Sequence, residues 1–96
     1  MRYVISYDIT DERIRRRIMK LCKAYGQRVQ YSIFECELTR DRLTDLLSRL
    51  DETRRADGMD PSDSIRAYRI CDECAREVVV LGYRPKIVTE VGSVIV

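Results

Sequence analysis

The first stretch of the chain, residues 3–10, combines a strand composition with an immediate helix start. Its first residues are mostly β-branched, aromatic or small, and such side chains suit the pleated surface of a sheet. The strand then presents Asp8 at its C-terminal end, where a side chain is held rigidly yet reaches the rim of the sheet. Asp8 is therefore a candidate functional residue. The alternative is that Asp8 only begins the turn, by accepting hydrogen bonds from the N–H groups of Thr10 or Asp11.

A helix is predicted directly after this strand, with Thr10 or Asp11 as its cap and Gly26 at its end. Apolar residues recur at helical spacing and form a stripe that is expected to be buried: Ile14, Ile18, Leu21, Cys22 and Tyr25. The cations of this helix are mostly Arg and fall off the stripe. Arg makes planar, bidentate contacts with phosphate, although an Arg-rich helix is more often simply a solvated one.

Residues 27–38 alternate with a period of two, which indicates extended structure. The pattern alone predicts one long strand, with a bend near Tyr31-Ser32 as the alternative. Phe34 belongs to the core on residue type. Its neighbours Arg28 and Ser32 would also suit a phosphate backbone with a base stacked on an aromatic ring.

The remaining chain predicts a second helix and further strands. Thr39 caps a helix whose buried face is formed by Leu43, Leu46, Leu47 and Leu50. Residues 56–62 form a loop, expected to be the most mobile segment, and residues 63–71 form a strand. A turn over residues 72–76 and a short strand over residues 77–81 follow. The apolar tail, residues 86–96, is expected to pair with the domain's own sheet or with a partner's edge.

This order predicts an α+β sandwich with helices on one face of an antiparallel sheet, compatible with the ferredoxin-like (βαββαβ) plan. The 96 residues suffice for one domain. The absence of histidine excludes Ser-His-Asp and Cys-His catalysis within the chain. No apolar run is long enough to span a membrane, and we expect a cytoplasmic protein with reduced cysteines. A structural role is favoured for Cys71-x-x-Cys74, with metal or redox chemistry between subunits as the alternative.

Two long motifs carry a resemblance to a known family. They are Tyr7-Asp8-Ile9-Thr10-Asp11 followed by Arg15-x-Arg17, and Gly26-x-Arg28-Val29-Gln30-Tyr31-Ser32-Ile33-Phe34-Glu35. The similarity continues through residues 63–71 to Leu81-Gly82. Together, in this order and at this separation, they resemble the CRISPR-associated Cas-two family over nearly the whole chain.

The resemblance implies a ferredoxin-like core over residues 1–82, in which residues 27–38 form a tight hairpin. It implies a homodimer in which the tail, residues 83–96, pairs as an extra C-terminal strand with the partner's sheet. It further implies that the Asp8 carboxylates of the two subunits face each other near the two-fold axis and share one Mg²⁺ per dimer as catalytic metal ligands. The implied nucleic-acid-binding residues are Tyr7, Arg15, Arg17, Arg28, Ser32 and Phe34.

Two functions follow from the resemblance. In the first, the protein is a Mg²⁺-dependent endonuclease that cuts single-stranded RNA and possibly double-stranded DNA. In the second, it is a non-catalytic DNA-binding scaffold that bridges two Cas-one integrase dimers during protospacer integration. The scaffold needs basic surfaces and a docking tail, whereas only the nuclease needs Asp8.

Overall fold

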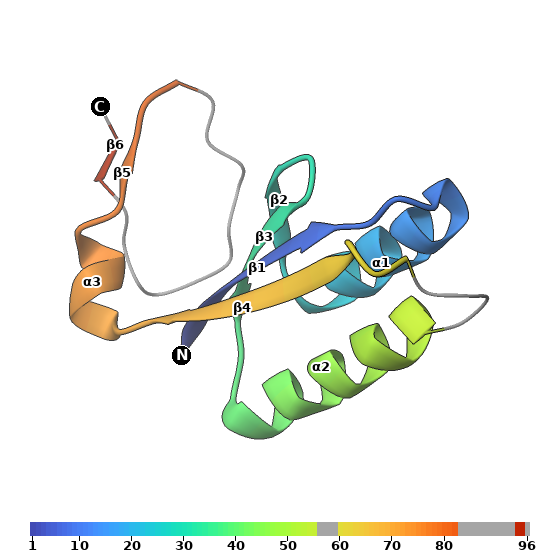
Figure 1. Cartoon of the computed structure of the whole chain (residues 1–96). Helices are drawn as coiled ribbons and strands as arrows, with labels where there is room; N and C mark the ends of the chain where they lie inside the picture. Colours follow the sequence, from blue (N-terminus) through green and yellow to red (C-terminus); the bar gives the residue numbers. More distant parts are fainter. Residues whose placement is uncertain (56–59, 83–93, 96) are drawn as a thin grey trace.

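The computed structural model describes residues 1–55, 60–82 and 94–95. Four antiparallel strands form a sheet in the order β2-β3-β1-β4 (Figure 1). They are β1 (Arg2–Asp8), β2 (Gln27–Gln30), β3 (Ile33–Glu37) and β4 (Ser64–Ile70). Helices α1 (Glu12–Tyr25) and α2 (Arg40–Arg55) lie on one face of this sheet. The order confirms the predicted ferredoxin-like α+β fold. Within the described residues, no helix is long and apolar enough to cross a membrane.

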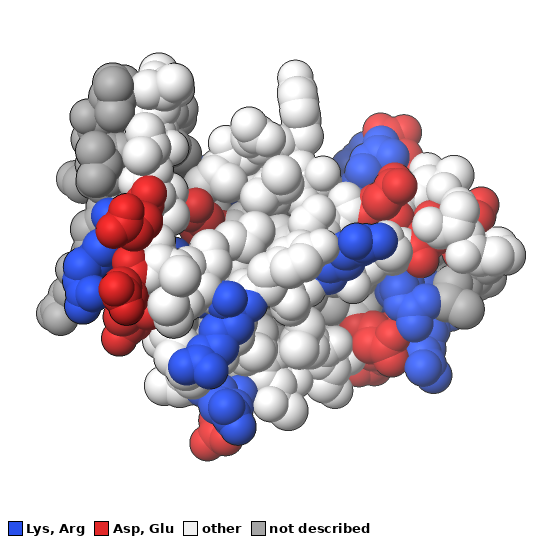
Figure 2. Space-filling view, turned by 60° about the vertical axis from the view of Figure 1, so that its left-hand side comes forward, with Lys and Arg blue, Asp and Glu red and all other residues white. Residues whose placement is uncertain are grey.

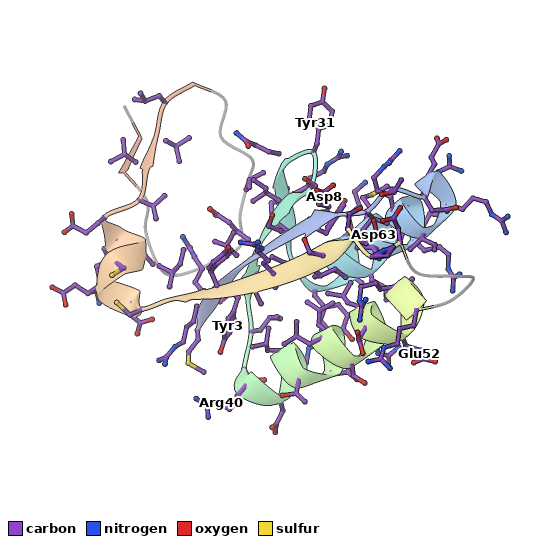
Figure 3. The ribbon with its side chains drawn as sticks, viewed as in Figure 1. Tyr3, Asp8, Tyr31, Arg40, Glu52 and Asp63 are labelled. Atoms are coloured by element: carbon purple, nitrogen blue, oxygen red, sulfur yellow. The ribbon has the colours of Figure 1, made fainter. Side chains whose placement is uncertain are left out.

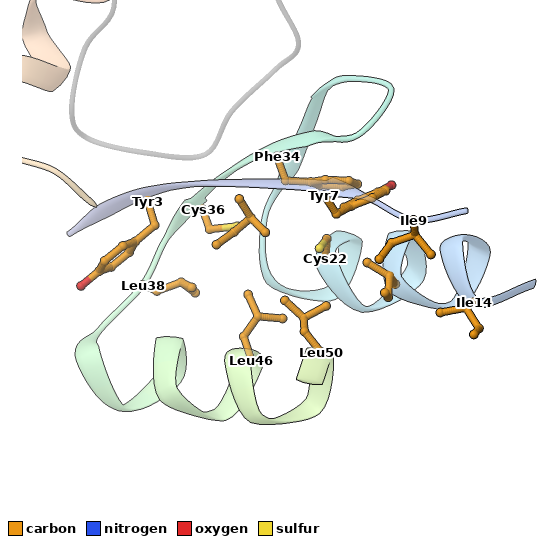
Figure 4. Packing of buried hydrophobic residues seen from close by; sticks show 12 residues of the cluster. Tyr3, Tyr7, Ile9, Ile14, Cys22, Phe34, Cys36, Leu38, Leu46 and Leu50 are labelled. Atoms are coloured by element: carbon orange, nitrogen blue, oxygen red, sulfur yellow. The ribbon is translucent and has the colours of Figure 1, made fainter. Parts of the chain in front are cut away.

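Strand β1 is the centre of the sheet, since β3 and β4 pair with it on either side. Tyr3, Ile5 and Tyr7 point from β1 toward the helices and are at most 5% exposed. They pack with Phe34 and with the apolar stripes of both helices (Figure 4). Because side chains alternate along a strand, Asp8 falls on the opposite, uncovered face, at the end of β1 and opposite Ser64 of β4.

Helix α1 begins and ends as predicted. Asp11 is the N-cap, and its carboxylate accepts a hydrogen bond from the N–H of Ile14 at 2.9 Å. Gly26 ends the helix in an extended conformation, with φ of −163°, rather than in the left-handed one typical of a glycine stop. The reason for glycine is instead the close approach of β3. A Cβ on Gly26 would lie 2.5 Å from the carbonyl oxygen of Glu35 and would overlap the sulfur of Cys36.

Residues 27–38 form a hairpin, so the prediction of one long strand is wrong and the alternative bend at Tyr31-Ser32 is confirmed. The two-residue turn is attached to its surroundings by the backbone. The carbonyl oxygen of Ser32 accepts a hydrogen bond from the N–H of Tyr7 at 3.1 Å. The pairing of β2 with β3 shifts register between Arg28 and Gln30, a local irregularity that the period-two pattern did not reveal.

Helix α2 also follows the prediction. The hydroxyl of Thr39 accepts a hydrogen bond from the N–H of Arg42 at 3.2 Å and caps the helix. Leu46 and Leu50 are buried, and the leucines at positions 43 and 47 are partly buried against the same core. The two helices therefore cover one face of the four-stranded sheet, and the opposite face, to which Asp8 belongs, stays uncovered.

The C-terminal part differs from the prediction at two points: residues 72–76 are helical, and the strand predicted over residues 77–81 is confined to Val79–Val80. Residues 72–76, expected as a turn, form the short helix α3 (Asp72–Arg76), capped by the Cys71 sulfur, which accepts a hydrogen bond from the N–H of Cys74 at 3.3 Å. Five residues are too few to show a helical repeat in the sequence.

Strand β5 (Val79–Val80) pairs in parallel with β6 (Val94–Ile95), so this part of the tail pairs within its own chain. The rest of the predicted tail and residues 56–59 of the predicted mobile loop lie outside the described residues.

Candidate functional site

A pocket of about 360 Å³ opens between the end of β1, the first half of α1 and the turn between β2 and β3. Five of the residues predicted from the sequence line it: Tyr7, Asp8, Arg15, Arg28 and Ser32. They come from three separate segments of the chain, and only the fold brings them together. The pocket combines three guanidinium groups, those of Arg15, Arg16 and Arg28, with the carboxylates of Asp8 and Glu12 and with hydroxyl groups. Because Arg16 and Glu12 pair with each other, Arg15 and Arg28 remain to attract an anionic, phosphate-containing ligand.

The carboxylate of Asp8 is exposed and, among the described residues, makes no hydrogen bond or ion pair. The turn after β1 is stabilised by two other carboxylates. Asp11 caps α1, and Asp63 accepts hydrogen bonds from the N–H of Thr10 at 2.8 Å and from its hydroxyl at 2.9 Å. Figure 3 shows Asp63 and Asp8 at the same end of the sheet. The alternative interpretation of Asp8, as the residue that forms the turn, is therefore not supported by the structure.

Two of the three arginines of the pocket, Arg15 and Arg28, are oriented by backbone carbonyl groups. Arg15 donates from Nη1 to the carbonyl oxygen of Ile9 at 3.3 Å, and Arg28 donates from Nε to that of Tyr31 at 3.1 Å. Neither forms an ion pair with a described carboxylate, whereas the neighbouring Arg16 is paired with Glu12 at 3.1 Å. A guanidinium has five N–H donors. Arg15 and Arg28 therefore keep both donors and positive charge available for a phosphate group.

Tyr7 lines the pocket, and its ring packs on the buried ring of Phe34. Their rings stack with centroids 6.4 Å apart, and Phe34 has no exposed surface (Figure 4). Phe34 is thus a core residue here, as its residue type favoured, and its ring is not available to stack on a base. The hydroxyl of Tyr7 donates to the carbonyl oxygen of Tyr31 at 3.4 Å. Burial raises the pKa of Tyr7, and the charges of Arg28 and Arg15 partly oppose this shift. Tyr7 is therefore a neutral hydrogen-bond donor at neutral pH.

Arg17 is not brought to the pocket. Two residues along a helix correspond to a rotation of roughly 200°, so Arg17 lies on nearly the opposite side of α1 from Arg15. It lines a separate hollow with Lys20, Leu21 and Thr53, between α1 and α2. The predicted grouping of Arg17 with the other site residues is thus absent from the geometry of this chain.

Asp8 also borders a second hollow, of about 280 Å³, on the sheet face that the helices leave uncovered. Ser6, Ser64, Arg66 and Tyr68 contribute to its lining. None of these four is predicted from the sequence as a site residue, because only the pairing of β1 with β4 places them beside Asp8. Figure 2 shows that Lys and Arg are interspersed with Asp and Glu on the face turned toward the viewer, in keeping with a net charge of +2. The arginines that line the two hollows beside Asp8, namely Arg15, Arg16, Arg28 and Arg66, supply positive charge near this carboxylate.

The donors present fit a hard cation only in part. Within residues 1–55, 60–82 and 94–95, no group of three or more His, Cys, Asp or Glu side chains could hold a metal ion. Asp8 supplies oxygen ligands, which Mg²⁺ prefers, and Mg²⁺ commonly binds one or two carboxylates while retaining water. A site at Asp8 thus fits Mg²⁺ if a second subunit adds its own carboxylate.

The four cysteines do not form a common site. All are free thiols, with Cys71 and Cys74 exposed and Cys22 and Cys36 buried in the core. The buried pair belongs to the hydrophobic cluster that packs beneath the sheet. It is therefore unable to complete a four-cysteine zinc site with the exposed pair.

Comparison with known proteins identifies relatives of this chain. Residues 1–78 match the family described as CRISPR associated protein Cas2. A CRISPR-associated endoribonuclease Cas2 of Synechocystis is 39% identical over 94 residues, which cover 98% of this chain and 97% of that protein. A CRISPR-associated endonuclease Cas2 of Thermus thermophilus is 40% identical over 86% of this chain and 83% of its own length.

Solved structures agree with these relatives. The crystal structure of Streptococcus pyogenes Cas2 superposes with a TM-score of 0.69 at 36% identity, covering 85% of this chain and all of that one. A hypothetical protein from Thermus thermophilus superposes with a TM-score of 0.71, also at 36% identity, over 90% of this chain and 95% of its own.

Proposed function

Because this chain belongs to the CRISPR associated protein Cas2 family, we propose that it is a Mg²⁺-dependent endonuclease that acts as a homodimer on RNA or DNA during spacer acquisition. One observation carries the proposal: Asp8 has a free carboxylate at the edge of the pocket that holds Arg15 and Arg28. The names of the relatives, endoribonuclease and endonuclease, support the same activity.

The proposed dimer places two Asp8 carboxylates opposite each other across the uncovered face of the sheet. Asp8 lies on this face at the end of β1, next to the hollow formed with Ser64 and Arg66. Two unpaired carboxylates at close range repel each other, so a cation between them would be strongly favoured. A bound Mg²⁺ would supply an activated water and would stabilise negative charge on a phosphodiester oxygen.

The remaining pocket residues hold and orient the substrate in this proposal. Arg15 and Arg28 bind non-bridging phosphate oxygens with the N–H groups that their carbonyl contacts leave free. Ser32 lines the same pocket and offers a hydroxyl for a further hydrogen bond. Because the backbone carbonyls of Ile9 and Tyr31 fix both arginines, the phosphate is held at a defined distance from Asp8.

The scaffold function, with Cas-one integrase dimers as partners, stays a prediction from the family resemblance. It requires nucleic-acid binding and no cleavage, so the experiment below separates it from the nuclease. The arginines of the pocket would serve both functions, whereas the charge of Asp8 would serve only the nuclease.

The test is a cleavage assay on labelled single-stranded RNA and duplex DNA, with Mg²⁺ and with EDTA. Wild-type protein is compared with Asp8→Asn and with Glu52→Gln, which removes an equivalent exposed carboxylate on α2, labelled in Figure 3. We expect cleavage that needs Mg²⁺, survives Glu52→Gln and is lost in Asp8→Asn, with the dimer intact. Equal cleavage by Asp8→Asn would refute the proposal. DNA binding without cleavage by the wild type would favour the scaffold.

A further inference from the structure

We propose that Tyr31 is a base-stacking residue that makes the Asp8 site selective for unpaired nucleic acid. Tyr31 is 88% exposed, more than any other large hydrophobic residue among those described, and it lines the same pocket as Asp8. Figure 3 shows its ring projecting from the tip of the hairpin between β2 and β3, away from the body of the molecule. The proposal deepens the proposed function, and its nucleic-acid-binding part is tested without cleavage.

The backbone of Tyr31 is held in place although its ring is exposed. Its carbonyl oxygen accepts hydrogen bonds from Nε of Arg28 at 3.1 Å and from the hydroxyl of Tyr7 at 3.4 Å. Tyr7 is itself buried and stacked on Phe34. The hairpin tip is thereby connected to the core, so the ring is presented from a rigid support.

The ring also has a cationic neighbour. The guanidinium carbon of Arg28 lies 5.8 Å from the centroid of the Tyr31 ring, within cation–π range. Arg28 also lines the pocket that holds Asp8, so its remaining N–H groups are available to a phosphate there while its guanidinium contacts the ring. A nucleotide bound at this point would place its phosphate near Arg28 and its base near the free surface of Tyr31.

This arrangement distinguishes unpaired from paired substrates. A base in a single strand can leave its neighbours and stack on an aromatic side chain, and such stacking tolerates any sequence. A base inside a duplex is already stacked and paired, so its face is available only after disruption of the helix. Phe34, the other aromatic residue of the hairpin, cannot take this role because it is fully buried.

The proposal is tested by binding in EDTA, where no Mg²⁺-dependent cleavage occurs. Fluorescence anisotropy would measure the affinity of wild type, Tyr31→Phe, Tyr31→Leu and Tyr31→Ala for a labelled single-stranded RNA and for a matched duplex. We expect Tyr31→Ala to weaken single-strand binding by roughly five-fold or more. Tyr31→Phe should bind like wild type, Tyr31→Leu should fall between the two, and duplex binding should change little.

Other results would overturn the proposal. Equal effects of Tyr31→Ala on both nucleic acids would show a general rather than a base-stacking contact. Full affinity of Tyr31→Leu would show that an apolar surface suffices, and loss of the dimer on gel filtration would assign Tyr31 to the subunit interface.

A wild-type protein that never cleaves but shows the expected binding series would refute the nuclease and leave the stacking role standing.

Discussion

Asp63 and Thr10 connect the two strands that meet at the candidate site. The Asp63 carboxylate accepts the backbone N–H of Thr10 at 2.8 Å and its hydroxyl at 2.9 Å. Thr10 follows β1 and Asp63 precedes β4, so this contact closes the ladder just beyond the Asp8–Ser64 pair. It fixes the direction in which the chain leaves β1 and relieves Asp8 of that structural role.

Replacing Asp63 should therefore disturb the site indirectly, because Asp63 does not line the pocket that holds Asp8. We expect Asp63→Ala to lower the free energy of unfolding by about 1 kcal/mol, because an exposed pair of hydrogen bonds is lost. Cleavage should fall as the orientation of Asp8 becomes less defined, and urea denaturation with a parallel cleavage assay would measure both effects. Asp60→Ala is the matched control, since among the described residues the Asp60 carboxylate bonds only to Ser62, within its own turn. Wild-type cleavage by Asp63→Ala would contradict this prediction.

Arg15 and Arg17 allow the effect of a side chain's position on α1 to be distinguished from the effect of its charge. Both are exposed, and each change to Ala removes one positive charge. Only Arg15 lines the pocket with Asp8, so Arg15→Ala should weaken nucleic-acid binding and reduce the salt dependence of the affinity by about one phosphate contact. Arg17→Ala should change both much less. Binding titrations at several salt concentrations would show this, and equal effects would place Arg17 in the interface as well.

Gly26 should not tolerate a side chain. A Cβ there would meet the carbonyl oxygen of Glu35 at 2.5 Å, and this oxygen belongs to the backbone of β3, so it has little room to move. We expect Gly26→Ala to lower the free energy of unfolding by about 1–3 kcal/mol, the usual range for overpacking. Chemical denaturation measures this directly. Unchanged stability would mean that α1 and β3 can separate more easily than their packing indicates.

The buried thiols predict a loss of stability at alkaline pH. Burial raises the pKa of Cys22 to about 12 and that of Cys36 to about 11. In the unfolded chain these thiols ionise near their ordinary pKa of 9.0, so the unfolded state releases protons first as the pH rises above that value. Their contribution to stability is complete below pH 9 and is lost progressively toward the raised values, by about 1.4 kcal/mol per pH unit for each group.

The control is Cys22→Ala. This variant should be less stable at every pH because it leaves a cavity, yet its stability should fall less steeply between pH 9 and 10. Urea denaturation over this range gives both slopes. The exposed thiols of Cys71 and Cys74 contribute equally to the pH dependence of stability in wild type and in Cys22→Ala, so their contribution cancels when the two slopes are compared. Identical slopes would show that Cys22 ionises as readily in the folded protein as in the unfolded chain.

The main elements could be predicted from sequence because their signals are local. The caps Asp11 and Thr39 and the helical repeat of apolar residues indicated α1 and α2 directly. The hairpin was ambiguous because Tyr31-Ser32 lacks the glycine or asparagine that usually marks a tight turn. The short helix α3 was not predicted because five residues are too few to show a helical periodicity.

The site was only partly predictable because its remaining contacts depend on tertiary structure. Asp63 reaches Thr10 across 53 positions of sequence, through the pairing of β1 with β4. The separation of Arg15 from Arg17 follows from helix geometry once α1 is oriented on the sheet. The exposure of Tyr31 follows from its place at the turn, whereas the alternating pattern grouped it with strand residues.

Mixed dimers provide the most direct test that two Asp8 carboxylates act on one metal ion. Wild-type and Asp8→Asn subunits would be unfolded together, refolded at equal amounts, and assayed for Mg²⁺-dependent cleavage of single-stranded RNA. If both carboxylates are required, only wild-type homodimers are active, and the rate should fall to about one quarter of that of the same total amount of wild-type protein. A rate of about one half would show that each subunit works alone with its own Asp8, and would contradict the shared site.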